Sequence, residues 1–64
     1  MFECQIVDKD SYCILVQKLV LPAVPNRGDC INIDGDEFPT MIVSFRSFRL
    51  DKDKNLVKIT IYVE

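Results

Sequence analysis

Short runs of apolar and β-branched residues alternate with polar turn clusters along this 64-residue chain. No segment spaces its apolar residues 3.6 positions apart over the length of a helix, so the pattern is typical of a small sheet or barrel. The expected strands are residues 2–7, 12–21, 30–33, 38–50 and 56–63. The length suits one domain, and closing a sheet removes its exposed edges. We therefore expect a single all-β domain over residues 1–64, a five-stranded antiparallel SH3-like or OB-like barrel or a meander.

The second expected strand is apolar at both odd and even positions, at residues 13–16 and again at 19–21. A strand of this kind is usually covered on both faces. Chains this short bury only about 60% of the surface that the unfolded form exposes. A second copy of the chain is therefore the expected cover, and the protein is predicted to be a homo-oligomer. The predicted interface residues are Cys13, Leu15, Leu19 and Leu21.

The fourth expected strand changes the face of its apolar residues midway. Val43 and Phe45 share one parity, whereas Phe48 and Leu50 share the other. Keeping all four in the core requires one extra residue, which predicts a β-bulge near residues 46–47.

Such a bulge would bring Arg46 and Arg49 to the same outward face. Two guanidinium groups on one face are suited to a phosphate or carboxylate. Arg46 and Arg49 are thus the predicted anion contacts, with Arg27 and Lys58 as candidates to enlarge the patch. The alternative is a solvated face whose arginines pair with Asp51, Asp53 or Glu37 at little energetic value.

The chain contains no histidine, the commonest general base and metal ligand. Its three cysteines, Cys4, Cys13 and Cys30, form no C-x-x-C pair and are expected to be reduced and to behave as buried apolar groups. Whether Cys4 and Cys13 meet across the first hairpin stays open. The acidic segment 32–37 is interpreted as a hairpin turn rather than a calcium site. We therefore predict no enzymatic activity, no catalytic residue, no cofactor and no metal.

The expected localisation and the net charge of the chain narrow the range of possible binding partners. No signal peptide and no apolar run of membrane-spanning length is visible, so a cytoplasmic protein without membrane contact is expected. The net charge of −2 disfavours general nucleic-acid binding.

A loop-to-strand motif carries a resemblance to known proteins. It consists of Val24-Pro25-x-x-Gly28-Asp29-x-Ile31-x-Ile33, followed by Phe38, Ile42-Val43 and Val57-x-Ile59-x-Ile61-x-Val63. This arrangement resembles a family of short uncharacterised proteins of bacteria, phages and mobile elements. The resemblance implies a small SH3-like β fold. It also implies a stoichiometric inhibitor that binds a host protein or sequesters a nucleotide signal, and it assigns no functional residue.

The leading hypothesis is a non-enzymatic, homo-oligomeric binding protein that captures its ligand stoichiometrically, as a phage-type inhibitor sequestering a nucleotide signal of host defence would. The ligand would then be a phosphorylated small molecule. The alternatives are an adaptor or inhibitor that binds one host protein, and a structural subunit of a larger particle.

Overall fold

A computed structural model of the protein describes residues 1–35 and 40–64. Five strands are present in these ranges: β1 (Phe2–Asp8), β2 (Ile14–Leu21), β3 (Cys30–Ile31), β4 (Met41–Leu50) and β5 (Leu56–Val63). The described residues contain no helix, so the all-β prediction is confirmed. The predicted start of the fourth strand, at residues 38–39, lies outside the described residues.

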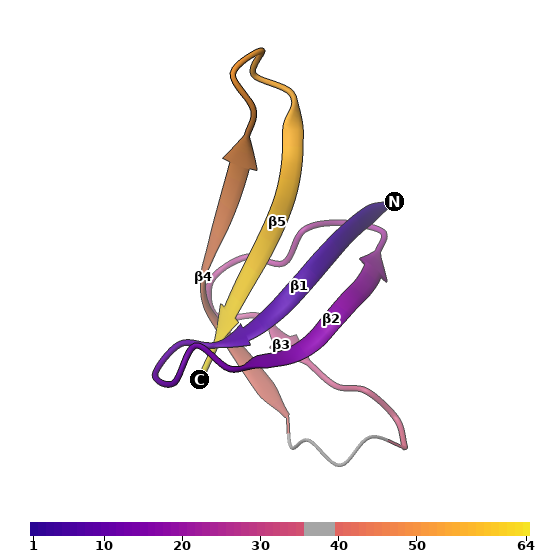
Figure 1. Ribbon diagram of the computed structural model, residues 1–64. Helices are drawn as coiled ribbons and strands as arrows, with labels where there is room; N and C mark the ends of the chain where they lie inside the picture. The colour runs from indigo at the N-terminus through magenta and orange to yellow at the C-terminus, as the bar shows by residue number, and fades with distance from the viewer. Residues whose placement is uncertain (36–39) are drawn as a thin grey trace.

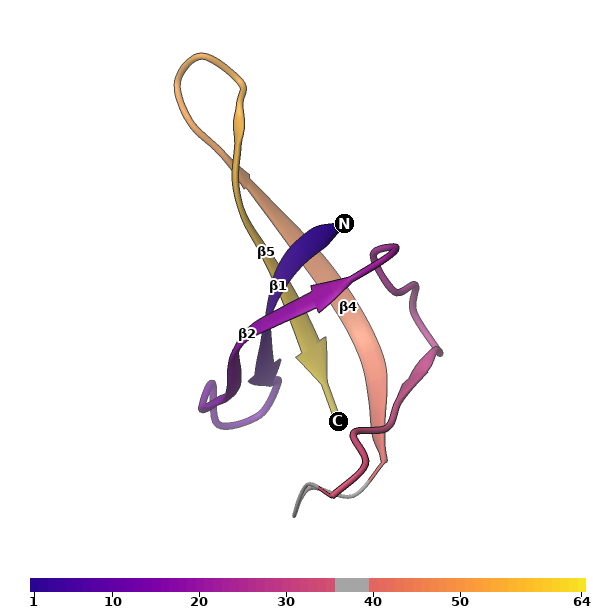
Figure 2. The same ribbon diagram turned by 90° about the vertical axis from the view of Figure 1, so that its right-hand side faces the viewer.

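The strands form one sheet in the order β2-β1-β5-β4-β3, curled into a half-barrel (Figures 1 and 2). β5 lies between β1 and β4 and pairs with β1 in parallel, from Cys4 opposite Ile59 to Asp8 opposite Val63. The other strand pairs are antiparallel. The antiparallel prediction is therefore wrong for the central pair of strands. The last strand inserts beside the first, instead of extending a meander, so the sheet is mixed.

The core lies on the inner face of this curled sheet. Cys4 and Ile6 of β1, Val43 of β4, and Ile61 and Val63 of β5 are fully buried there. Ile31, Met41 and Ile59 complete the buried cluster, and the half-buried residues Leu15, Val16, Leu19, Leu21, Val24 and Ile33 pack against it. The predicted inward positions Ile59, Ile61 and Val63 are thus confirmed, whereas Val57 is exposed beside a register shift in β5.

Two register shifts explain why β2 is apolar at both parities. Cys4 and Ile6 of β1 pair with Leu19 and Val16, and Val7 pairs with Ile14, so β2 carries extra residues in both intervals. Each extra residue turns the following side chains to the other face. Leu15, Val16, Leu19 and Leu21 therefore all reach the chain's own core. The mixed parity that was attributed to burial on both faces arises from these irregularities in pairing.

The bulge of β4 is present, but it lies at Ser44 rather than near residues 46–47. Val43 pairs with Val63 and Phe45 with Tyr62, which leaves Ser44 as the extra residue. From Phe45 to Arg49 the pairing with β5 is unbroken. The bulge position in the prediction is therefore wrong. Phe45 therefore lies on the outer face, where its ring stacks on that of Tyr62, and it is not part of the core.

Candidate functional site

The side chains of Arg46 and Arg49 project from opposite faces of β4. The two residues are three positions apart in a regular part of the strand, and successive side chains alternate between its faces. Arg46 lies opposite the buried Ile61, so it shares the inner face. Its guanidinium lies 5.4 Å from the centre of the Phe48 ring, and Nη1 donates to the Val24 carbonyl at 3.4 Å. The predicted clamp of these two guanidiniums on one outward face is therefore not formed in a single chain.

Arg49 instead lies directly opposite Lys58 of β5 on the outer face. Arg27 is exposed in the loop between β2 and β3. In the described ranges, the ion pairs are Lys9 with Glu64 and Lys18 with Glu3, so none of the predicted cations is neutralised by Asp51 or Asp53. Their predicted partner Glu37 lies outside the described residues. Arg49 and Lys58 are the two predicted site residues that the structure brings together.

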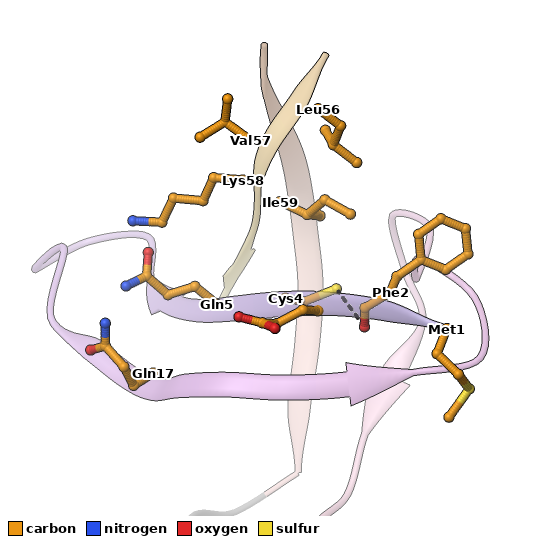
Figure 3. A pocket seen from close by; sticks show the side chains of 10 residues that line it. Met1, Phe2, Cys4, Gln5, Gln17, Leu56, Val57, Lys58 and Ile59 are labelled. Atoms are coloured by element: carbon orange, nitrogen blue, oxygen red, sulfur yellow. Dashed lines mark hydrogen bonds between the residues drawn. The ribbon is translucent and has the colours of Figure 1, made fainter. Parts of the chain in front are cut away.

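A cleft of about 470 Å³ opens where β5 diverges from β1 (Figure 3). The parallel pairing starts at Cys4 and Ile59, so the first residues of both strands splay apart. Leu56 and Ile59 project to one side of β5, and Val57 and Lys58 project to the other. The cleft therefore has an apolar side and a polar side.

The polar side of the cleft is formed by Lys58, Gln5 and Gln17, from three different strands. Gln5 is only 6% exposed, yet no fully buried side-chain nitrogen or oxygen in the described residues lacks a partner. Its side chain nevertheless lines the cleft. One ammonium and two amides can donate hydrogen bonds to an anionic or carbonyl oxygen. Glu3 also lines the cleft and forms an ion pair with Lys18 at 3.6 Å.

The sequence alone did not single out Gln5, Gln17 or Glu3. Gln5 was expected at an outward polar position, which is compatible with a solvated face. The signal that marks it is burial, and burial follows from the position of β1 between β2 and β5.

Apolar side chains continue beyond the core onto the projecting β4–β5 hairpin. Phe48 lies opposite Ile59, and Leu50 lies opposite Leu56. Phe48, Leu50 and Leu56 are each about half exposed. We call these three residues, with the exposed Phe2 across the cleft, the hairpin apolar surface. A contiguous surface of this kind usually marks contact with another protein.

The predicted interface residues have mixed positions in the single chain. Leu15, Leu19 and Leu21 are half buried against the core, and Cys13 is exposed. All three thiols are free, and Cys4 alone is buried, which raises the pKa of its thiol. The expectation of buried cysteines is therefore wrong for Cys13 and Cys30.

The motif that carried the family resemblance shapes a turn in this structure. Gly28 has a φ of 91°, and its N–H donates to the Val43 carbonyl at 2.8 Å. The Asp29 carboxylate accepts a hydrogen bond of 2.7 Å from the Asn26 N–H. These contacts hold the loop against β4, so both residues have a structural role here.

Within residues 1–35 and 40–64, no group of three or more cysteine, aspartate and glutamate side chains could hold a metal ion. The acidic turn that was weighed as a calcium site lies partly outside these ranges. No helix among the described residues is long and apolar enough to cross a bilayer.

The fold and the cleft together define an all-β half-barrel with a polar cleft beside an exposed apolar hairpin. A scan of protein-family models, a search of curated proteins and a search of solved structures find no match to this chain. The resemblance to short bacterial and phage proteins stays a prediction.

Proposed function

We propose that this protein is a non-enzymatic binding protein whose working form is a homo-oligomer and which acts by stoichiometric association. The observation that carries the proposal is the hairpin apolar surface, where Phe48, Leu50 and Leu56 lie about half exposed. Exposed apolar side chains that gather on one part of the surface often mark contact with another protein. The lack of histidine supports the non-enzymatic part, because the usual general base is missing.

Light scattering and native mass spectrometry of the purified chain test this proposal. We expect a multiple of the single-chain mass that falls on dilution. Replacing Leu50 and Leu56 together with lysine should shift the mass toward one chain. The variant should still fold, as circular dichroism would show, because both side chains are about half exposed in the single chain, and its melting temperature should fall only by the stabilisation that association supplies. The matched control is Asp53→Lys, which adds the same charge at the neighbouring turn and should leave the mass unchanged. A single chain at several hundred micromolar would contradict the proposal.

A second candidate function is capture of a small anionic ligand in the cleft. It is favoured by Lys58, Gln5 and Gln17, which line one side of a cleft within the size range of ligand sites. Arg49 does not line the cleft, but its position opposite Lys58 places a second positive charge beside that residue. A phosphorylated small molecule such as a nucleotide has the oxygen acceptors that these groups match. In this proposal Lys58 and Arg49 replace the pair Arg46 and Arg49 as the anion contacts.

Calorimetric titration with inorganic phosphate and a panel of nucleotides tests this capture. Lys58→Glu combined with Arg49→Glu should abolish binding, whereas Lys52→Glu combined with Lys54→Glu, in the exposed turn, should leave it intact. Binding that survives the first pair of changes would place the ligand elsewhere. The alternatives of a host-protein adaptor and a particle subunit predict one stoichiometric protein in a pull-down and very large assemblies, respectively. The finer fold prediction of an SH3-like or OB-like barrel also remains a proposal.

A further inference from the structure

Part of β4 has a free edge. β3 pairs only with the first two residues of β4. Val43 then exchanges hydrogen bonds of 2.8 Å with the N–H of Gly28 and the carbonyl of Asp29. From Phe45 onward, the described residues place no strand on the side of β4 that faces away from β5. Alternate backbone N–H and C=O groups of a strand paired on one side point outward, so this edge can accept another strand.

The outer edge of β2, at the other end of the sheet, is protected by comparison. Two register shifts interrupt its pairing with β1, and Lys18 lies within one of them, between Val16 and Leu19. Irregular pairing and an edge lysine are features that discourage strand addition. The free part of β4 has neither an interruption nor a lysine, and its pairing with β5 is regular from Phe45 to Arg49. It is therefore the better edge for a new strand.

The sequence of this free edge is complementary to itself. It reads Phe45-Arg46-Ser47-Phe48-Arg49, and reversal about Ser47 exchanges each phenylalanine for an arginine. Two copies that pair antiparallel about a twofold axis place residues of equal parity opposite each other, because opposed side chains share a face. Pairing centred on Ser47 therefore sets Arg46 opposite Phe48 and Phe45 opposite Arg49.

Neighbouring registers lack this complementarity. Centring the pairing on Arg46 or Arg49 sets two guanidiniums against each other, and like charges directly opposite are unfavourable. Centring it on Phe48 leaves both arginines without an aromatic partner. An arginine over an aromatic ring is a favourable contact, and Arg46 already lies 5.4 Å from the Phe48 ring within one chain.

We propose that the second copy in the homo-oligomer adds to the free edge of β4, antiparallel and in register about Ser47. The sheet then runs continuously through two chains. Arg46 and Phe48 alternate across the junction on the inner face, and Phe45 and Arg49 do so on the outer face. This inference rests on the proposed homo-oligomer and specifies its interface, which differs from the β2 interface expected from the sequence.

Cysteine cross-linking tests the register directly. In a chain with Cys13→Ser and Cys30→Ser, Ser47→Cys would place its thiol opposite its own copy. Opposed residues in an antiparallel pair have Cα atoms roughly 4.5–5.5 Å apart, which is within disulfide range. Mild oxidation should therefore give a covalent dimer in high yield. Phe45→Cys and Arg49→Cys alone should not cross-link, because each thiol lies about 13 Å from its copy. An equal mixture of those two variants should cross-link as a mixed dimer.

Separate outcomes bear on the interface and on the oligomer. If the chain is oligomeric but Ser47→Cys stays uncross-linked, the β4 interface is wrong and the proposed function stands. Cross-linking of Phe45→Cys with itself would overturn the register. A single-chain mass for the unmodified protein would overturn both proposals. Circular dichroism of each variant verifies that it is folded, which these exposed positions permit.

Discussion

Phe45 and Tyr62 lie directly opposite each other on β4 and β5, and their rings stack with centroids 4.4 Å apart and planes 17° apart. Tyr12, in the turn before β2, meets the same Tyr62 ring edge-on at 6.2 Å. This aromatic row lies on the outer face, and it links three parts of the chain that are distant in sequence.

The stacked pair should show energetic coupling. A double-mutant cycle with Phe45→Ala and Tyr62→Ala, measured by urea unfolding at low protein concentration, should give about 0.5–1.5 kcal/mol. The opposed pair Ser47 and Thr60, on the same face, serves as the control and should give less than about 0.5 kcal/mol. A coupling energy near zero for the aromatic pair would show that the stack adds nothing beyond burial.

The turn between β1 and β2 should make the stability of the fold depend on pH in the acidic range. The Asp8 carboxylate accepts a 2.7 Å hydrogen bond from the Ser11 hydroxyl, which lowers the pKa of Asp8. A group whose pKa is lower in the folded state contributes stability above its unfolded pKa, near 4, and loses it as pH falls through the folded pKa. Ser11→Ala should therefore flatten the decline of the urea midpoint below about pH 4, whereas Asp10→Asn should retain most of it. An unchanged acid profile for Ser11→Ala would contradict this account.

The β4–β5 turn holds Lys54 at a φ of 66°, in the left-handed region. A non-glycine residue there is strained by about 1–2 kcal/mol, and glycine loses up to about 1 kcal/mol more entropy on folding. Lys54→Gly should therefore stabilise the protein by roughly 0.5–1 kcal/mol, seen as a higher melting temperature. Lys52→Gly, in the same turn without a positive φ, should be neutral or destabilising. Equal effects of the two changes would argue against strain at Lys54.

Substituting an isoleucine of the core should cost much more folding stability than substituting one at the edge of the sheet. Ile61 is fully buried, whereas Ile14 is about half exposed. Ile61→Val should cost about 0.5–1.5 kcal/mol and Ile61→Ala about 2–5 kcal/mol, enough to unfold a domain of this size. Ile14→Val should cost less than about 0.5 kcal/mol. Chemical denaturation of the three variants makes this comparison, and similar costs at both positions would mean that the inner face is not the core.

The local pattern of the sequence predicted most strands, because alternation and turn residues act over a few positions. Ile59, Ile61 and Val63 alternate inward as expected. The change of parity along β4 also showed that an extra residue was needed, but the assignment of Phe45 to the core placed that residue after Phe45. Pairing with Tyr62 selects Ser44, and parity alone could not show it.

The candidate site was harder to predict, because it depends on which strands become neighbours. The sequences of β1 and β5 contain no pattern that predicts their parallel pairing. This pairing nevertheless buries Gln5 and brings Lys58 to the cleft. The bulge at Ser44 likewise decided that Arg46 turns inward and Arg49 outward. Both outcomes are long-range effects that residue spacing within one strand cannot reveal.

The ladder at the middle of the sheet joins Cys4 to Ile59 and Asp8 to Val63. The β1–β2 and β4–β5 hairpins can each form early, but they unite only by closing nearly the whole described chain into a loop, which is slow compared with local pairing. During synthesis, the β1–β2 hairpin would leave the ribosome before β5. The edge of β1 that pairs with β5 would then stay unpaired until β5, through Val63, has also emerged. Assembly of the core therefore has to wait for β5, and the interval before it is when the chain is most open to aggregation or to capture by a chaperone.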